Sequence, residues 1–299
     1  MNWLRLVKND MERSQPNVFR LSWEPITDIK EYVVDISETE DFSSSVRIFT
    51  KENFCEIDNL KIGQQYFYKI NNEHFHTFKT KGDAPRFIRI DGALNVRDLG
   101  GNKIKQGILY RGSALDSPFA ITEKGKYTFR NVLKIRTELD LRREVQGRII
   151  SSAAGNDIQY VWLPYNAYKE VFEKEHQEEI CRIMEFLSLE KNYPIYVHCM
   201  GGADRTGMIA LFLRALAGES DDDIHLDYEL TSLSTFAAYG AKESPEGFRQ
   251  RTAGYYVNFL KILKTYAPNQ PLSMQVKNFL LDCGVTEETI NKIIKIIKI

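Results

Sequence analysis

The sequence predicts a two-domain chain, in which a small all-β sandwich precedes an α/β domain with a mainly parallel central sheet flanked by helices. The chain has 299 residues, enough for two domains of about 150 residues each. Residues 15–80 contain short alternating strands separated by turn signals, which favours a sandwich. After residue 85, strand patterns alternate with helix patterns, which favours an α/β domain.

The first domain is expected over residues 1–82. Residues 31–37 alternate so that apolar side chains share one face of a strand, and residues 66–70 repeat the pattern. Residues 75–80 can pair with that second strand after a turn at Asn71-Asn72.

Two details narrow this interpretation. Trp23 lies on an early strand, and Leu60 and Tyr66 have the spacing of a tyrosine corner. With these features the region resembles a fibronectin type III domain. The resemblance implies a packing module or spacer without chemistry of its own, with binding of a protein partner as the alternative. The polar stretch 79–85 contains Gly and Pro and predicts a linker, so the second domain spans 83–299.

The second domain contains alternating strand and helix patterns. Strands are predicted at 87–90, 108–111, 139–141, 158–163 and 195–198. Helices are predicted at 169–191, from Arg205 to a stop near Gly218, and at 223–233, 248–265, 272–282 and 287–299.

Composition excludes several classes of protein. Lys plus Arg is 40 and Asp plus Glu is 41, so the net charge of −1 offers no basic excess for a nucleic-acid partner. No apolar run approaches the ~20 residues of a membrane span. Fifteen Tyr, 17 Phe and 3 Trp supply material for a core, which argues against disorder.

The cysteines indicate no metal site. Cys55, Cys181, Cys199 and Cys283 are far apart, and no close Cys/His pairing of a zinc site is present. We therefore expect neither a metal nor an organic cofactor. This use of cysteine suits a reducing compartment, and residues 1–10 show no signal peptide. A cytoplasmic location is expected, with a secreted or cell-surface location as the alternative implied by the fibronectin-like module.

Residues 196–207 carry the pattern most informative for chemistry. An apolar strand ends at His198, a helix begins near Arg205, and a tight loop with two consecutive glycines joins them. Such a loop can turn its N–H groups inward as an anion-binding nest, and the helix start adds further N–H groups. We therefore expect a phosphate to be bound by Met200, Gly201, Gly202, Ala203, Asp204 and Arg205.

Cys199 at the start of this loop is expected to be a nucleophile. A thiol pKa of about 8.5 falls to roughly 3.5–7.5 near helix N-termini and cations. Arg205, six positions later, can hold the phosphate bidentately while the sulfur attacks in line to give a phosphocysteine. Thr206 is expected to donate a hydrogen bond to the departing sulfur. His198 is expected to orient the loop through backbone contacts.

The Cys-x5-Arg loop resembles that of cysteine-dependent protein-tyrosine phosphatases, and its Asp-Arg-Thr-Gly ending resembles the bacterial atypical family with lipid-active, dual-specificity members. Further motifs similar to those of the family follow in the expected order, namely Asn95–Gly101, Leu109–Ser113, Leu139–Arg142 and Asp227–Thr231. The resemblance covers residues 86–299 and implies a phosphatase domain without a cofactor.

The leaving oxygen needs a proton donor. The Trp-Pro-Asp tripeptide that many tyrosine phosphatases use is missing, and Pro164 is not followed by a carboxylate. The resemblance implies that Asp204 is the acid. Asp140, at a predicted strand end, is the second candidate, with a structural pairing to Arg142 or to the loop amides as the alternative.

One difference from the family pattern, at position 203, indicates the substrate class. Family members that act on phosphoinositides commonly carry Lys where this chain has Ala203. A missing second cation favours phosphotyrosine in protein over a phospholipid head group. A phosphoinositide or inositol-phosphate phosphatase remains the alternative, with charge from Arg97, Arg111, Arg142 and Arg143. An inactive phosphate-binding adaptor is a further alternative, against which the intact Cys199, Asp204, Arg205 and Thr206 argue.

Two smaller expectations concern packing. Arg97 and Asp98 are expected to form an ion pair that braces the turn after them. Tyr165, Tyr168 and Phe172 are expected either to line the mouth of the site or to cap the core.

Overall fold

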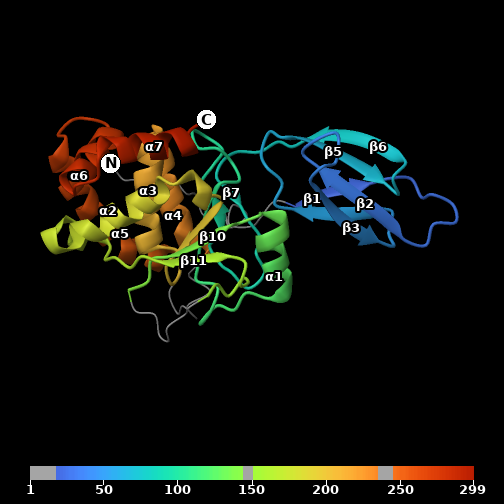
Figure 1. The fold of residues 1–299 in the computed structure, drawn as a ribbon, viewed down its shortest axis with the longest axis horizontal. Helices are drawn as coiled ribbons and strands as arrows, with labels where there is room; N and C mark the ends of the chain where they lie inside the picture. The colour runs from blue at the N-terminus through green and yellow to red at the C-terminus, as the bar shows by residue number, and fades with distance from the viewer. Residues whose placement is uncertain (1–17, 144–150, 235–244) are drawn as a thin grey trace.

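The computed structural model describes residues 18–143, 151–234 and 245–299 (Figure 1). Six antiparallel strands come first, and Figure 1 shows them as a blue-to-cyan body apart from the helices. They are β1 (Val18–Ser22), β2 (Tyr32–Ser37), β3 (Ser45–Thr50), β4 (Phe54–Asp58), β5 (Gln65–Ile70) and β6 (His74–Lys79). They form a β1-β4 pair and a β3-β2-β5-β6 sheet.

Both N-terminal sheets contribute to one apolar core. Leu21 and Ile57 from the first sheet pack with Val34 and Tyr66 from the second. The hydroxyl of Tyr66 accepts a hydrogen bond from the backbone N–H of Lys61 at 2.8 Å.

The second part of the chain is built on a six-stranded sheet of order β11-β10-β12-β9-β8-β7. Its strands are β7 (Arg86–Phe87), β8 (Arg97–Asp98), β9 (Leu109–Gly112), β10 (Thr137–Asp140), β11 (Gln159–Trp162) and β12 (Ile195–His198). The four strands β9 to β12 pair in parallel, whereas β7 and β8 are antiparallel additions at one edge. The mainly parallel sheet is as predicted.

Helices pack against this sheet and against one another. They are α1 (Glu123–Tyr127), α2 (Lys174–Leu187), α3 (Asp204–Ala217), α4 (Asp221–Ser234), α5 (Pro245–Leu263), α6 (Leu272–Asp282) and α7 (Glu287–Ile297). Helix α3 contacts α4, α6 and α7, and its residues from Thr206 to Ala217 are all buried. A helix that is buried on every face, as α3 is, lies at the centre of a core. It ends at Gly218, whose φ of +83° suits glycine, as the sequence predicts.

Two predicted elements differ from the structure. The single helix expected over 169–191 is a 3₁₀ turn (Tyr168–Phe172), the helix α2 and a second 3₁₀ turn (Glu190–Asn192). Glu173 has extended backbone angles and separates the first turn from α2, which the apolar periodicity of the helix could not indicate. The strand expected over 87–90 is the two-residue β7.

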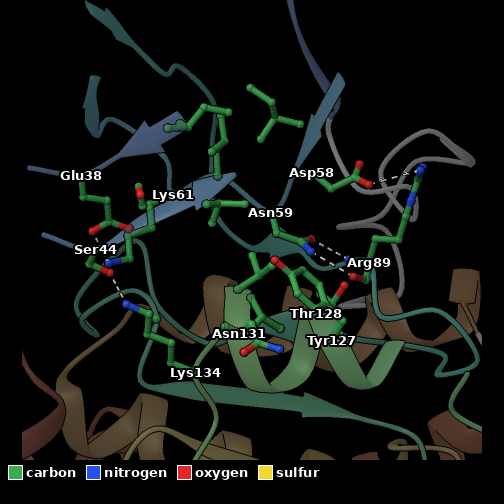
Figure 2. Close-up of a pocket in the computed structure, with 18 of the residues that line it drawn as sticks. Glu38, Ser44, Asp58, Asn59, Lys61, Arg89, Tyr127, Thr128, Asn131 and Lys134 are labelled. Atoms are coloured by element: carbon green, nitrogen blue, oxygen red, sulfur yellow. Dashed lines mark hydrogen bonds and ion pairs between the residues drawn. The ribbon is translucent and has the colours of Figure 1, made fainter. Parts of the chain in front are cut away.

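Hydrogen bonds join the two parts beside a cavity. The Gln106 side chain accepts from the N–H of Ile62 at 2.8 Å and donates to its carbonyl at 2.9 Å. Asn59 makes the same reciprocal pair with the backbone of Arg89, which Figure 2 draws. The cavity of about 490 Å³ lies between β3, β4 and α1, and no residue of the loop at 199–205 lines it.

Candidate active site

The loop that the sequence singles out joins β12 to α3. Strand β12 ends at His198 and α3 begins at Asp204, so residues 199–203 form the connection. Because β12 lies between the parallel strands β9 and β10, the loop emerges at the carboxyl edge of the sheet. Ligands of α/β proteins are generally bound at this edge.

Gly202 is required by the path of this loop. Its φ is +67°, a conformation that side chains rarely adopt. A Cβ atom at this position would lie 2.2 Å from the carbonyl oxygen of Gly112 at the end of β9. The loop therefore packs its backbone directly on the neighbouring strand.

The carbonyl groups in the middle of the loop are bonded to buried side chains behind it. The Asn95 amide donates to the carbonyl oxygens of Gly201 and Gly202, each at 3.1 Å. Arg111 Nη2 donates to the carbonyl of Gly202 at 2.6 Å and, more weakly, to that of Ala203 at 3.4 Å.

The carbonyl groups of Cys199 and Met200, at the start of the loop, are also bonded to groups behind the loop. His198 Nδ1 lies 3.0 Å from the carbonyl oxygen of Cys199, and the N–H of Ala114 donates to that of Met200 at 2.9 Å. Within the described residues, nothing accepts a hydrogen bond from the N–H groups of residues 201–205. Unpaired N–H groups at a helix start, with carbonyls held behind them, are the chemistry of an anion site.

Cys199 lies at the start of the loop and is 3% exposed. The Tyr165 hydroxyl donates to the carbonyl of Arg205, and Cys199, Arg205 and Asp204 all act electrostatically on Tyr165. Burial raises the pKa of this phenol well above its ordinary value. Cys199, Arg205 and Asp204 thus all lie near Tyr165.

The other cysteines have environments that keep them protonated. Burial raises the pKa of Cys55 to about 11 and that of Cys283 to about 12. Burial also raises the pKa of Cys181, whose thiol donates to the carbonyl of Cys283 at 2.8 Å. None of these three thiols is suited to nucleophilic attack at neutral pH.

His198 is a charged anchor behind Cys199. Burial alone would lower the pKa of its imidazole, but Asp140 and Glu138 outweigh burial and raise it to about 9. Its Nε2 lies 2.9 Å from Glu138 Oε1, and its Nδ1 bonds the Cys199 carbonyl. His198 therefore bonds the backbone at Cys199 on one side and a carboxylate on the other.

The two carboxylates considered as proton donors have different surroundings. Asp204 is partly exposed at the start of α3, and Tyr168 donates a hydrogen bond to its Oδ1. Asp140 is fully buried, and it accepts hydrogen bonds from Arg142 at 2.6 Å and from Tyr160 at 2.7 Å. Burial would raise the pKa of Asp140, but His198 and Arg142 hold it below its usual range. A carboxylate kept ionised suits a structural anchor better than an acid.

Arg205 and Thr206 follow on the first turn of α3. In the part of the chain that the structure describes, the Arg205 guanidinium has neither a hydrogen bond nor an ion pair. The Thr206 hydroxyl is buried and has no hydrogen-bond partner among the described residues. Both groups are therefore available to a ligand or a reacting atom in the loop.

Sequence analysis did not single out Asp227, on α4, as a functional residue. Its carboxylate binds Arg97 Nε at 2.9 Å and also binds Arg111, and all three residues are buried. Asp227 lies 130 residues from Arg97 in the chain, so no local spacing could pair them. The only signal was its place in the last of the resemblance motifs.

The expected ion pair between Arg97 and Asp98 is wrong. Consecutive residues of a strand point to opposite faces, so these two side chains diverge from β8. Arg97 binds Asp227, whereas Asp98 binds Arg86 at 2.5 Å. Asp98 still braces the following turn, because it accepts a hydrogen bond from the N–H of Gly100 at 2.8 Å.

The predicted aromatic cluster divides between the two roles considered for it. Phe172 packs in the core, with its ring centroid 5.0 Å from that of Phe279. Tyr165 and Tyr168 bond loop residues through their hydroxyl groups. The ring of Tyr168 stacks on that of Tyr255 at 5.6 Å, and Tyr255 is 63% exposed.

The four arginines considered as additional cations for a substrate are buried or paired with carboxylates. Arg97 and Arg111 are fully buried behind the loop. Arg142 is buried between Asp140 and Asp116. Arg143 is 42% exposed, and its guanidinium binds Glu179 at 2.7 Å.

One group of side chains in the described ranges has the geometry to hold a metal ion. The ligand atoms of Glu173, Glu175 and His176 lie within 4.8 Å of one another. This exposed group shares no residue with the loop, and acidic groups of this kind are common without a metal. The described helices include none with the length and apolar character that a membrane span requires.

The known proteins to which this chain is similar are phosphatases. A family model described as "Tyrosine phosphatase family" matches residues 88–297. The chain is similar to the core catalytic domain of PP-IP phosphatase SIW14 from S. cerevisiae in complex with citrate, with 18% identity over 55% of this chain and 91% of that chain and a TM-score of 0.34. A structure of the Siw14 catalytic core gives 18% identity, coverage of 52% and 92%, and a TM-score of 0.32. No curated protein matches the chain.

Proposed function

Since this chain belongs to the tyrosine phosphatase family and is a cysteine-dependent phosphatase, we propose that it hydrolyses phosphomonoesters through a phosphocysteine formed on Cys199. The polarity of the loop supports this proposal most directly. Its carbonyls at Gly201 and Gly202 are bonded behind it, while the N–H groups of 201–205 have no acceptor among the described residues. The non-bridging oxygens of a phosphate would accept from these groups and from Arg205.

The first step transfers the phosphoryl group to sulfur. The Cys199 thiolate attacks phosphorus, a bond from Sγ to phosphorus forms, and the bond from phosphorus to the ester oxygen breaks. In the second step a water oxygen attacks phosphorus and the bond to sulfur breaks, which releases inorganic phosphate and restores the thiolate. Thr206 is suited to donate to the departing sulfur, because its buried hydroxyl has no other partner among the described residues.

Asp204 is proposed as the acid and base of the two steps. It protonates the leaving oxygen in the first step and takes a proton from the attacking water in the second. The hydrogen bond from Tyr168 fixes one carboxylate oxygen and leaves the other to carry the proton. Asp140 is assigned the structural role, because Arg142, Tyr160 and His198 hold it as a buried carboxylate.

Phosphotyrosine in protein is the proposed substrate. Ala203 leaves the loop without a second cation, and Arg97 and Arg111 are buried behind it. The exposed ring of Tyr255, stacked on Tyr168 beside Asp204, offers an aromatic surface to an aryl phosphate.

A phosphoinositide or inositol phosphate is the second candidate substrate. Arg143 favours it, because this half-exposed guanidinium could bind a further phosphate group in exchange for Glu179.

The N-terminal residues 1–82 are proposed to form a separate fibronectin type III-like module, with the catalytic domain over 83–299. The shared core of the two sheets and the contact between Lys61 and Tyr66 support this division. The module is proposed to be a spacer or a binding site for a protein partner.

A turnover panel tests the proposed function. Wild type, Cys199→Ser and the control Cys181→Ser are assayed on p-nitrophenyl phosphate, phosphotyrosine peptides and soluble inositol phosphates. We expect Cys199→Ser to abolish turnover and Cys181→Ser to retain it. Phosphate binding without turnover of any substrate by the wild type would instead support an adaptor.

A further inference from the structure

The loop is held from behind by a chain of buried polar residues that ends at one carboxylate. Among the described residues, the side chains of Asn95 and Arg111 donate to the carbonyls of Gly201 and Gly202. Neither donor stands alone, and the contacts that fix each of them lead to Asp227 on α4.

Arg111 is fixed by a direct ion pair. Its Nη1 binds Asp227 Oδ2, while its Nη2 bonds the Gly202 carbonyl. Since the guanidinium is planar, fixing one nitrogen on Asp227 also fixes the direction of the other. The side chain is fully buried, so water cannot replace either partner.

Asn95 is fixed through Arg97. Arg97 Nη1 donates to the side-chain oxygen of Asn95, which turns the amide nitrogen toward the loop. Arg97 itself binds Asp227 Oδ1 through Nε at 2.9 Å and the Asp227 carbonyl through Nη2 at 2.7 Å. Asn95 has a φ of +56°, a conformation that Asn tolerates better than most residues.

Three guanidinium groups converge on the Asp227 carboxylate, because Arg214 from α3 lies 3.8 Å from it. Arg111, Arg97 and Arg214 overcome the effect of burial and hold the pKa of Asp227 far below its usual range. The carboxylate is therefore ionised, and its removal would leave buried positive charges unpaired.

We propose that Asp227 is a positioning residue for the phosphate loop, acting through Arg111 and through Arg97 and Asn95 on the carbonyls of Gly201 and Gly202. This inference rests on the proposed function. A peptide carbonyl and the next N–H group point in opposite directions, so holding these carbonyls behind the loop holds the following N–H groups toward the anion. Asp227 touches no reacting atom, and its effect is on the preorganisation of the site.

Asp98 provides a matched control for burial and charge. It is also fully buried, it pairs with Arg86 at 2.5 Å, and it accepts from the N–H groups of Gly100 and Gly107. None of these partners contacts the loop carbonyls, so Asp98→Asn reports the cost of disrupting a buried carboxylate and its hydrogen bonds away from the loop.

The test compares Asp227→Asn with Asp98→Asn in the full chain. Calorimetry measures binding of inorganic phosphate, steady-state assays on p-nitrophenyl phosphate give kcat and KM, and thermal melts report stability. We expect Asp227→Asn to weaken phosphate binding at least about tenfold and to lower kcat/KM roughly 100-fold. Asp98→Asn should lower Tm comparably while phosphate affinity stays within about twofold of wild type. Wild-type phosphate affinity in Asp227→Asn, or equal losses in the two variants, would overturn the proposal.

Asn95→Asp keeps the test decisive if Asp227→Asn does not fold. Asp keeps the size and tolerates the positive φ, but it replaces the donating amide with an acceptor facing two carbonyls. Weaker phosphate binding supports the proposal, and unchanged binding contradicts it. A wild type that binds phosphate but never turns over would end the proposed function while leaving this comparison of affinities valid. A wild type that does not bind phosphate would end both.

Discussion

The rear and front faces of the loop at 199–205 differ in how their polar groups are satisfied. Behind the loop, Asn95 and Arg111 bond its carbonyls, and Asp227 holds those donors. At the front, the N–H groups and the Arg205 guanidinium have no partner among the described residues. Buried polar groups are normally paired, so the unpaired set marks the place of a ligand. Different residues therefore bind the anion directly and hold the loop from behind, so substitutions can test each face separately.

The largest effect is expected at the front of the loop, from Arg205→Lys. An ammonium group cannot hold two phosphate oxygens as the guanidinium fork does, so kcat/KM for p-nitrophenyl phosphate should fall roughly 1,000-fold. Tm should change little, because the guanidinium has no partner in the described part of the protein. Steady-state kinetics and thermal melts check both expectations.

Arg143→Lys is the control for this variant, since Arg143 is half exposed and lies outside the loop. It should leave turnover of this small substrate within about twofold. A loss below about tenfold in Arg205→Lys would mean that the front of the loop does not depend on bidentate binding.

Gly202→Ala should disturb both faces together. The new Cβ would lie 2.2 Å from the Gly112 carbonyl, and the φ of +67° disfavours a side chain. The loop must shift away from β9, so we expect kcat/KM to fall about 100-fold and Tm to fall as well.

Gly254→Ala is the matched control, because among the described residues, apart from the adjoining backbone of α5, no atom lies within 4 Å of the position that its Cβ would take. Alanine there should stabilise the helix by about 0.5–1 kcal/mol and leave turnover unchanged. Equal behaviour of the two variants would show that the loop tolerates a displaced Gly202.

Asp204→Asn should affect substrates unequally. A phenolate with a low pKa leaves without a proton, whereas an alkoxide does not, so the loss should exceed about tenfold only for poor leaving groups. The measurement is kcat across a series of aryl and alkyl phosphates. An equal loss across the series would contradict the assignment of Asp204 as the acid.

The sequence predicted the front of the loop at 199–205 but missed the contacts behind it. The front of the loop is encoded by consecutive residues, so local patterns could indicate the strand end at His198, the two glycines and a helix start near Arg205, which the structure places at Asp204. The rear depends on contacts between distant segments. The ion pair between Arg97 and Asp227 spans 130 residues and has no period or motif of its own.

Strand geometry explains the clearest error. Arg97 and Asp98 are neighbours in sequence, but side chains alternate between the two faces of β8, so Arg97 pairs with Asp227 and Asp98 pairs with Arg86. The tyrosine phosphatase family match supports the catalytic domain, whereas local patterns alone could not have paired Asp227 with the loop.

His198, behind the loop, is expected to make the stability of the protein depend on pH. Because its folded pKa is raised to about 9, above its ordinary value of 6.5, its contribution to stability is fully present below pH 6.5 and is lost as pH rises through about 9. The free energy of unfolding should therefore fall by about 1 kcal/mol between pH 7 and pH 8. Urea titrations on a Cys199→Ser background exclude the loop thiol as the source.

His225 cannot supply this slope, because burial lowers the pKa of its imidazole. His198→Gln should remove the slope above pH 7 while leaving the acidic range to the carboxylates. An unchanged slope in that variant would show that His198 is not charged in the folded protein.

The smallest effect is expected from Tyr255→Ala, which tests the aromatic surface beside the front of the loop. Tyr255 stacks on Tyr168 and is 63% exposed, so its loss should cost little stability. An aryl substrate would lose one stacking contact, worth about 0.5–1.5 kcal/mol, and kcat/KM for phosphotyrosine peptides should fall roughly 2- to 10-fold. Turnover of inositol phosphates should not change, because these substrates have no aromatic ring. Tyr127→Ala removes a similarly exposed tyrosine beside the cavity between the two parts and should alter neither substrate. Equal losses on both substrates in Tyr255→Ala would mean that the ring supports the loop rather than selecting the substrate.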